Sequence, residues 1–308
     1  MSEIYDLAIL GAGPAGITAA IYALRGKMNI LWIDEKFATG GQITDTSEID
    51  NYPGMPGVTG MDLGEAMGEH ARRIGAEPVR EKVRSLENLD QEIRTIRTKK
   101  HEYQARAVIL ALGAAHRKLM IPGEEELSGM GVSYCATCDG AFYKDRVVAV
   151  TGGGDVALED AAFLARLCKK VYIIHRRDVF RGTKVLQDQI FRCENVEVIW
   201  DSVAEEILGE SEVTGLRIRN IKTEEKRDLD VDGVFVAVGM EPDTGIVKGM
   251  VKLDEAGYIC AGEDCVTSIP GVFAAGDIRT KPLRQVVTAV ADGACAASSA
   301  MKYLDGLG

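Results

Sequence analysis

Two glycine-rich turns decide the fold of this chain: Gly11-Ala12-Gly13-Pro14-Ala15-Gly16 and Gly152-Gly153-Gly154-Asp155-Val156-Ala157. In such a turn the first glycine permits a tight bend, and the second lets the backbone approach a pyrophosphate. The third small residue lets the following helix pack closely on the strand, and the helix N-terminus offers free N–H groups to phosphates. Both turns therefore predict dinucleotide-binding units. The residues expected to lie against the nucleotides are Gly11, Gly13, Pro14, Ala15 and Gly16, and Gly152, Gly154, Asp155, Val156 and Ala157.

The stretches around the two turns repeat one design. Short apolar strands without clean alternation, typical of strands buried on both faces, are predicted at Ile4–Leu10, Ile30–Ile33, Val147–Val150 and Val171–Ile174. In both halves 23 residues separate the first glycine from the end of the second strand, at Asp34 and at His175. A returning buried strand then ends in glycine, at Gly113 and at Gly239. The chain thus contains two α/β units of one design.

The order of these segments predicts that the second unit is inserted into the first. A buried strand over Gly271–Asp277 and a helix over Val286–Leu304 follow the second unit and are expected to complete the first one. Glycine and proline make Met120–Gly123 and Gly239–Pro242 the natural linkers. We therefore predict two Rossmann-like, three-layer α/β domains, residues 1–115 with 245–308 and residues 116–244.

Length and charge set outer limits on function. The 308 residues suit two domains, and 47 acidic against 36 basic residues give a net charge of −11. Such a chain has no general attraction for nucleic acid or anionic lipid. No basic residue precedes Arg25, and no apolar run approaches the ~18 residues of a membrane span. We expect a cytoplasmic protein, in which seven cysteines do not form a disulfide framework.

The ends of the second strands distinguish the two ligands. Asp34 and Glu35 can accept hydrogen bonds from a ribose hydroxyl and would repel a 2′-phosphate, so the first site suits the adenosine half of FAD. The second unit instead has a basic set that suits the 2′-phosphate of NADPH: His175, Arg176, Arg177 and Arg181. The alternative is that these arginines form a solvated basic face.

The C-terminal segment supports a flavin in the first domain. Gly276-Asp277 follows a buried strand, and Asp277 could hold a ribityl hydroxyl. Arg284-Gln285-Val286 opens the last helix, whose N-terminus beside the flavin pyrimidine edge would stabilise negative charge on the reduced flavin. Residues 1–115 with 245–308 are therefore the expected FAD-binding domain, and residues 116–244 the expected NADPH-binding domain.

Cys135-Ala136-Thr137-Cys138-Asp139 is the expected chemical centre. A C-x-x-C pair can close a small, reducible disulfide, and Asp139 is a candidate general acid for the thiolate. Zinc would need a second such pair or suitably spaced histidines, so no metal site is expected, while a buried structural pair remains an alternative. Cys260 and Cys265 are interpreted as incidental, and the cysteines at or near helices as packing residues: Cys168, Cys193 and Cys295.

Several motifs together resemble the low-molecular-weight, bacterial-type thioredoxin reductases over essentially the whole chain. They are G-A-G-P-A-G (11–16), G-G-Q-I (40–43), C-A-T-C-D-G (135–140), G-G-G-D-V-A (152–157), H-R-R-D-V-F-R (175–181), G-V-F-A-A-G-D (271–277) and R-Q-V (284–286). The resemblance implies a homodimer that contains FAD and passes electrons from NADPH to thioredoxin. It also implies that the flavin site includes Gly40, Gly41, Gln42, Asn51, Val83, Gly113 and Gly276, and that Val238 and Gly239 lie near the nicotinamide nucleotide.

The expected function is an NADPH-dependent, FAD-containing thioredoxin-disulfide reductase. The resemblance implies that Cys138 is the thiol nearest the flavin and that Cys135 attacks the partner's disulfide. Because the redox pair and the flavin belong to different domains, we expect the two linkers to allow a domain rotation. Alternatives are a reductase of another small redox protein, a ferredoxin-linked thioredoxin reductase, a ferredoxin–NADP reductase, a dithiol oxidase and, as a non-enzyme, a flavin-binding redox sensor.

Overall fold

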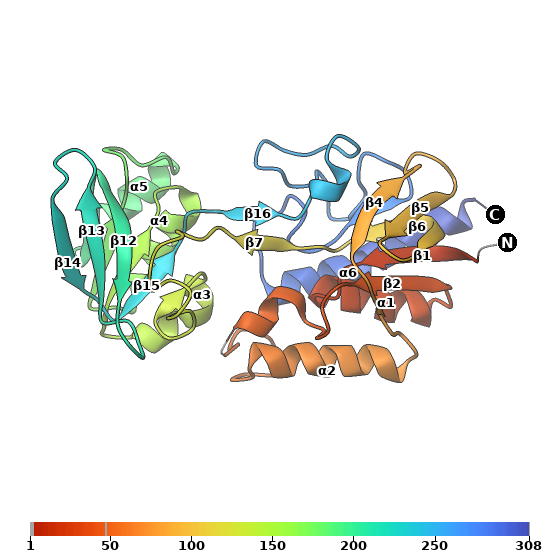
Figure 1. Cartoon of the computed structure of the whole chain (residues 1–308), viewed down its shortest axis with the longest axis horizontal. Helices are drawn as coiled ribbons and strands as arrows, with labels where there is room; N and C mark the ends of the chain where they lie inside the picture. Colours follow the sequence, from red (N-terminus) through yellow and green to blue (C-terminus); the bar gives the residue numbers. More distant parts are fainter. Residues whose placement is uncertain (1–2, 47, 308) are drawn as a thin grey trace. The chain divides into compact units, whose positions relative to one another are not determined.

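Strands and helices follow one another along the computed structural model, which describes residues 3–46 and 48–307 (Figure 1). The fold is α/β with several sheets, and the chain divides into two compact units. One unit comprises the chain up to Ala115 and from Glu241 onward, and the other is His116–Met240. The second change of unit thus lies just before the predicted position at 244/245. Within the described residues, no helix combines the length and apolar character that a membrane span requires.

The first unit is built on a seven-stranded sheet, in the order β3-β2-β1-β6-β5-β4 with β17 also paired to β6. Its parallel strands are β1 (Ile4–Leu10), β2 (Ile30–Asp34), β3 (Val79–Arg80), β6 (Glu102–Leu110) and β17 (Val272–Ala274). The antiparallel strands are β4 (Val83–Glu87) and β5 (Arg94–Thr98), and β5 pairs with the first half of β6. The second half of β6 is left for β17, so the C-terminal part of the chain completes this sheet.

Both faces of the first sheet are covered, which explains the absence of alternation in its strands. Leu7 and Ile9 of β1 pack with helices α1 (Pro14–Arg25) and α6 (Val286–Asp305). Ala8 and Leu10 point to the other face and share a core with the β4–β5 hairpin and the segment around Val247–Ile278. All four side chains are fully buried. The remaining elements of this unit are α2 (Gly60–Arg73), η1 (Gly41–Asp45) and η3 (Gly245–Val247).

The second unit repeats this arrangement with a five-stranded parallel sheet in the order β11-β10-β9-β15-β8. Its strands are β8 (Val132–Ser133), β9 (Val147–Thr151), β10 (Lys170–Ile174), β11 (Val196–Ile199) and β15 (Gly233–Val236). Helices α4 (Asp155–Leu164) and α5 (Lys184–Ile190) pack on one face. An antiparallel sheet covers the other face and consists of β12 (Ser202–Leu208), β13 (Gly215–Asn220) and β14 (Lys226–Asp230). Short helices α3 (Ala136–Asp139) and η2 (Gly140–Tyr143) precede β9.

The two connections between the units run as a pair. β7 (Ala114–His116) and β16 (Met240–Pro242) form a two-stranded sheet. On the side of the second unit, Arg117 N–H donates to Gly239 O at 2.9 Å. The predicted second linker contains β16, but the predicted first linker, Met120–Gly123, lies inside the second unit.

A buried carboxylate explains why the first linker belongs to that unit. Glu124 is 2 % exposed, and its side chain accepts hydrogen bonds from the backbone N–H of Leu119 at 2.8 Å and of Met120 at 2.7 Å. The hydroxyl of Tyr134, next to Cys135, donates to the same carboxylate at 3.0 Å. Because these donors would otherwise be left unpaired on burial, the carboxylate fastens the chain after β7 to the second unit.

Candidate active site

Cys135 and Cys138 are joined by a disulfide with a Cα–Cα distance of 5.3 Å. Cys135 is the N-cap residue of α3, two residues after the end of β8, and its carbonyl accepts the N–H of Cys138 at 3.2 Å and of Asp139 at 3.1 Å. One helical turn therefore brings the two sulfurs together, and the predicted disulfide is confirmed. Among the described residues, no cluster of histidine, cysteine or acidic side chains is placed to hold a metal ion.

Asp139 supplies a carboxyl group at the disulfide turn. Its Oδ2 accepts the hydroxyl of Ser133 at 2.6 Å, while Oδ1 is buried and has no hydrogen-bond partner among the described residues. Burial raises the pKa of Asp139, and the hydrogen bond from Ser133 offsets this only in part. Ser133 Oγ also accepts the N–H of Cys135 at 3.1 Å, so one serine ties the carboxyl to the redox turn. The carboxyl group is suited to hold and release a proton close to the sulfurs.

The first glycine turn is shaped so that only its middle glycine has free space. A Cβ on Gly11, where φ is +111°, would lie 2.3 Å from Ala111 O, and a Cβ on Gly16 would lie 2.0 Å from Gly11 O. By contrast, the nearest atom to a Cβ on Gly13 would be Gly40 O at 3.9 Å. Gly13 is the N-cap of α1, and no side chain caps this helix end. The N-terminus of α1 therefore keeps its N–H groups free for an anion.

Asp34 holds the first turn in shape, a role that the sequence pattern did not predict. Its Oδ2 accepts the N–H of Ala12 at 2.5 Å, and its Oδ1 accepts the N–H of Lys36 at 2.6 Å. Each carboxylate oxygen retains a second acceptor position, which is available to a ribose hydroxyl. Glu35 is exposed and pairs with Lys82 at 2.9 Å.

The Gly40-Gly41-Gln42 segment, which the resemblance assigns to the flavin site, lies against the first turn. The N–H of Gly40 donates to Ala12 O at 2.8 Å, and a Cβ on Gly41 would lie 3.0 Å from the Cα of Gly13. Both glycines have positive φ, +116° and +62°, which favours glycine at each position. The segment then continues as η1, which starts at Gly41 and includes Gln42.

The end of β17 reaches the same turn from the far end of the sequence. Gly276, with φ of +81°, places a hypothetical Cβ 3.0 Å from the Cβ of Ala15. The next residue, Asp277, has a buried Oδ1 with no hydrogen-bond partner among the described residues, and the same is true of the Nε of Arg284. Because buried polar atoms are nearly always paired, each of these two atoms indicates a place where a polar ligand can bind.

The start of α6 adds the remaining residues predicted for this site. Gln285 is the N-cap of α6 and forms a capping box with Thr288, so Val286 is the first helical residue. The side-chain amide of Asn51 donates to Gln285 Oε1 at 3.0 Å. The guanidinium of Arg284 lies 3.9 Å from the ring centre of Tyr258.

Two further residues predicted for the flavin site lie near the ends of strands. Val83 is the first residue of β4. Gly113 follows β6, has a φ of +74°, and has open space beside it.

The second glycine turn repeats the geometry of the first. A Cβ on Gly152, where φ is +147°, would lie 2.4 Å from Ala237 O and 2.8 Å from the Cβ of Ala157. Gly154, the uncapped N-cap residue of α4, has nothing within 4 Å of a hypothetical Cβ. Asp155 uses its Oδ1 to accept the N–H of Thr183 at 2.7 Å. Of the other predicted residues near this turn, Val156 is exposed, Val238 is half-buried and Gly239 has a φ of +112°.

The loop that carries Arg176, Arg177 and Arg181, here called the arginine loop, is anchored to this turn, but His175 at its start faces inward. The N–H of Arg181 donates to Gly153 O at 2.8 Å, and the guanidinium groups of Arg176, Arg177 and Arg181 form no ion pair within the described residues. His175 is instead 5 % exposed, and its Nε2 lies 3.0 Å from Val179 O. Burial lowers the pKa of His175, and the three arginines lower it further. The prediction grouped this histidine with the phosphate ligands, whereas it packs beneath the loop that presents the arginines.

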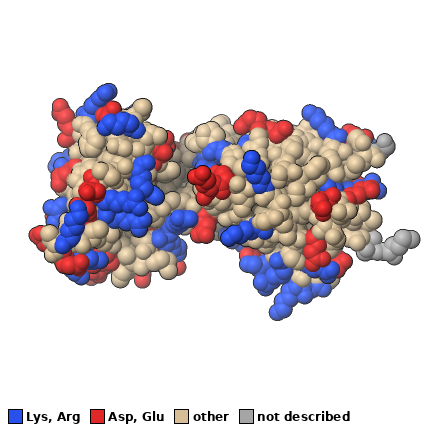
Figure 2. Space-filling view, turned by 90° about the horizontal axis from the view of Figure 1, so that it is seen from above, with Lys and Arg blue, Asp and Glu red and all other residues tan. Residues whose placement is uncertain are grey.

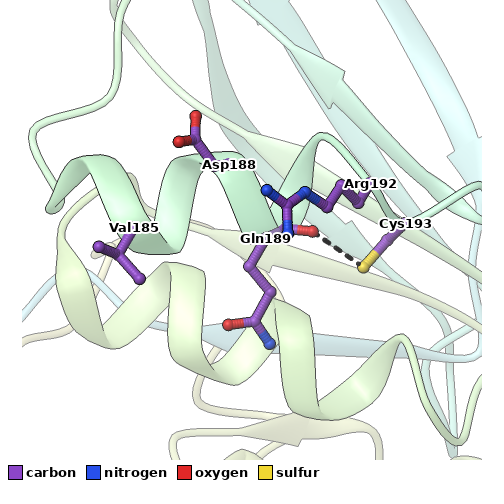
Figure 3. Close-up of a pocket in the computed structure, with 5 residues that line it drawn as sticks. All are labelled: Val185, Asp188, Gln189, Arg192 and Cys193. Carbon is purple, nitrogen blue, oxygen red and sulfur yellow. Dashed lines mark hydrogen bonds between the residues drawn. The ribbon is translucent and has the colours of Figure 1, made fainter.

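The other cysteines do not form a second redox centre in the described structure. Cys260 and Cys265 are both free thiols, and burial raises the pKa of Cys265 to about 12. Cys168 is buried, as expected of a packing residue, but Cys295 is exposed on α6, so its prediction as a packing residue was wrong. Cys193 lies by a hollow of about 540 Å³ on α5, and its Sγ donates to Gln189 O at 3.4 Å (Figure 3). No residue of the predicted sites lines this hollow.

Comparisons with known proteins agree with one another over nearly the whole chain. Residues 5–293 match the pyridine nucleotide-disulphide oxidoreductase family. A thioredoxin reductase of Peptoclostridium acidaminophilum is 46% identical over 312 residues, covering 99% of this chain and 98% of that protein. One of Listeria monocytogenes is 45% identical over 306 residues, covering 99% and 95%. The crystal structure of thioredoxin reductase from Streptococcus pyogenes is 43% identical, with a TM-score of 0.93 and coverage of 99% of this chain and all of that one.

Proposed function

Because the chain belongs to the pyridine nucleotide-disulphide oxidoreductase family and is a low-molecular-weight thioredoxin reductase within it, we propose that it carries electrons from NADPH through FAD and the Cys135–Cys138 disulfide to a thioredoxin. The observation that carries this proposal is the disulfide turn itself, in which the carboxyl group of Asp139 is partly unpartnered and has a raised pKa. A purely structural disulfide has no need of a buried proton donor beside it.

The first unit has the features that an FAD-binding Rossmann domain requires. The free space at Gly13 and the uncapped N-terminus of α1 suit a pyrophosphate, and the remaining acceptor positions on Asp34 suit a ribose. The unpartnered Oδ1 of Asp277 suits a ribityl hydroxyl, and the unpartnered Nε of Arg284 at the start of α6 suits an acceptor on the ring system. These features support the assignment of FAD to the first unit.

The second unit fits NADPH in the same way. Gly154 and the N-terminus of α4 have room for the pyrophosphate. The exposed arginines at 176, 177 and 181 have no carboxylate partners among the described residues, and arginine forks match the geometry of a 2′-phosphate. Figure 2 shows groups of Lys and Arg side chains on a molecule that is acidic overall. The positive charge of these arginines at the second turn would attract NADPH more strongly than NADH, because NADPH carries the additional 2′-phosphate.

The bound flavin would accept a hydride and supply two electrons to a disulfide. In our proposal, two electrons entering at Cys138 would break the Cys135–Cys138 bond, and two protons, one of them held by Asp139, would convert the two sulfurs to thiols. The Cys135 thiolate attacks the thioredoxin disulfide, so one bond in thioredoxin breaks and a mixed disulfide forms. Cys138 then displaces thioredoxin as a dithiol and restores the Cys135–Cys138 bond. Asp139 holds the proton that the departing thiolate needs.

The family membership also supports an assembly and a location. We propose that the enzyme is a homodimer in the cytoplasm. The pairing of β7 with β16 limits the connection between the units to two adjacent segments. Such a connection suits a rotation that presents the redox pair alternately to the flavin and to the protein substrate.

Reduction of thioredoxin by the purified enzyme, followed with NADPH as the donor, tests the proposal. Cys138→Ser should lower turnover with thioredoxin by several orders of magnitude, because serine cannot form the disulfide, while bound flavin should remain. Cys193→Ser is the matched control, since Cys193 is a half-buried free thiol in the same unit, and it should turn over like the wild type.

Three results would contradict the proposal in different places. Undiminished turnover in Cys138→Ser would exclude the disulfide from the electron path. Turnover with reduced ferredoxin but not with NADPH would show that the assigned electron donor is wrong. Bound flavin with no reductase activity toward any small redox protein would favour a sensor.

A further inference from the structure

A buried group of charges lies directly behind the end of β17. We name it the Asp292 cluster, and it consists of Asp292, Arg279 and Lys281. Asp292 is 5 % exposed and Arg279 2 %. The guanidinium of Arg279 forms a two-point contact with Asp292, at 2.7 Å and 2.8 Å, and Lys281 Nζ lies 2.8 Å from Asp292 Oδ2. The same Oδ2 accepts the N–H of Gly276 at 2.9 Å, so the cluster is fastened to the residue before Asp277.

The charges in this cluster do not cancel. One buried carboxylate faces two buried cations, and the further acid beside Arg279, Glu263 at 3.7 Å, is exposed and screened by solvent, so the buried part of the cluster carries a net positive charge. Arg279 alone saturates the charge of Asp292 through its two-point contact, which leaves the Lys281 ammonium in excess. An excess buried charge is costly unless a second group of opposite sign lies close by.

Asp277 is the nearby group of opposite sign. It follows Gly276 directly, and its Oδ1 is buried without a hydrogen-bond partner among the described residues. Burial raises the pKa of Asp277, while the charges of Lys281 and Arg284 lower it and that of Asp292 raises it. Without the Lys281 charge, burial would favour the protonated acid more strongly.

The two cations of the cluster differ in what else they hold. Arg279 also donates to the carbonyls of Ala261, at 3.3 Å, and Thr280, at 3.0 Å, so it fastens two loop segments. The side chain of Lys281 is 4 % exposed, and its ion pair with Asp292 is its single polar contact within the described residues. The main contribution of Lys281 is therefore its positive charge, because it holds fewer hydrogen-bond partners than Arg279.

We propose that Lys281 is a positioning residue of the flavin site: its buried ammonium keeps Asp277 ionised, so that the free Oδ1 is a pure acceptor for a ligand hydroxyl. An ionised carboxylate only accepts hydrogen bonds, whereas a protonated one also donates. The site therefore favours a sugar-alcohol hydroxyl, which can donate a hydrogen bond, over a phosphate oxygen, which cannot. This inference rests on the proposed FAD site and adds a residue that no glycine or redox motif contains.

A double-mutant cycle on FAD affinity tests the coupling. The apoproteins of wild type, Lys281→Met, Asp277→Asn and the double variant are titrated with FAD, and binding is measured by the quenching of flavin fluorescence. Lys281→Met should raise the Kd for FAD severalfold when Asp277 is present, because the carboxyl group then loses a positive charge that favours its ionised form. In the Asp277→Asn background, the same change should alter Kd by less than about twofold, because there is no charge left to support.

Three further variants serve as controls for the charge, the packing and the surface position of the substituted lysine. Lys281→Arg retains the charge and should keep Kd near that of the wild type. Lys281→Gln can still donate to Asp292 without a charge and should match Lys281→Met, so the test does not depend on how methionine packs. Lys302→Met, an exposed lysine of α6, should leave Kd unchanged.

The outcomes separate this inference from the proposed function. An equal rise in Kd in both Asp277 backgrounds would show that Lys281 only supports the fold, and an unchanged Kd in both would exclude any role; either result overturns the inference. A wild-type apoprotein that does not bind FAD would overturn the proposed function itself.

Discussion

At the scale of single residues, the exposed guanidinium groups of the arginine loop have the clearest consequence for nucleotide binding. Arg176 and Arg181 follow the buried His175 in the chain, and a backbone hydrogen bond from Arg181 anchors their loop to the glycine turn. If they hold a 2′-phosphate, the double change Arg176→Ala with Arg181→Ala should raise the Michaelis constant for NADPH by about 10²-fold. The loss of two charge-assisted bonds worth roughly 1.5–3 kcal/mol each would give about 10²- to 10⁴-fold, and because both arginines are exposed we expect the lower end of this range.

NADH provides the comparison for this prediction, because it lacks the phosphate. Its Michaelis constant should change little in the same variant, and Arg166→Ala, an exposed arginine after α4, should change neither constant. An equal rise for both nucleotides, measured by steady-state kinetics, would show that the loop does not read the phosphate.

Residues whose role follows from their own chemistry could be predicted from the sequence, and residues whose role depends on burial could not. The redox cysteines and the first glycine of each turn need no neighbours to be recognised. His175 stands in a basic run, yet only the packing of the loop turns its ring inward beneath Gly153. Lys281 belongs to no motif, and its partner Asp292 lies on another element.

Among the elements, α6 packs closely against the start of α1, at the first glycine turn. A Cβ on Gly293 would lie 2.2 Å from the backbone oxygen of Ala15 and 2.9 Å from the Cβ of Thr18. Helix propensity alone predicts that Gly293→Ala stabilises the protein by about 1 kcal/mol. The clash is with backbone that cannot move without shifting α1, and overpacking of this kind costs typically 1–3 kcal/mol.

We therefore expect Gly293→Ala to lower the free energy of unfolding, against its helix propensity. Urea unfolding measures this directly, and the weakening of FAD binding should accompany it because Ala15 belongs to the turn. Ala291→Gly, at an exposed position of the same helix, should cost only the propensity difference of about 1 kcal/mol. A stabilised Gly293→Ala variant would mean that α6 and α1 can separate without cost.

The sequence pattern predicted the strands that consist of a buried apolar run. It did not predict the elements that have one buried face and one charged, exposed face. The strands β1, β2, β9 and β10 lie where the apolar stretches indicated, within a residue at each end. The antiparallel sheet β12–β14 was missed because alternate residues carry ion pairs on its outer face. Arg217 of β13, for example, binds Asp228 of β14 at 2.8 Å, while Leu216 beside it is fully buried. The amphipathic helix α2 was likewise not recognised between glycines.

For the whole molecule, the insertion makes the second unit a separate folding body. It has its own cores on both faces of its sheet, and its two ends are held together by the hydrogen bond between Arg117 and Gly239. We predict that residues 116–240 fold when expressed alone, with one cooperative thermal transition, a Cys135–Cys138 disulfide and measurable binding of NADPH but not of FAD. Calorimetry and nucleotide titration check this, with Arg176→Ala and Arg181→Ala as the binding control. A fragment without a cooperative transition would show that the unit depends on its host.

The source of the fifth parallel strand has a consequence for synthesis on the ribosome. In the second unit that strand is β8, which comes before the other four, so the sheet can close once β15 has emerged. In the first unit it is β17, near the end of the chain, so the C-terminal half of β6 waits without this neighbour while the whole insert is translated. The nascent chain can therefore complete its inner unit first, and the outer unit acquires this strand only after the whole insert has been translated.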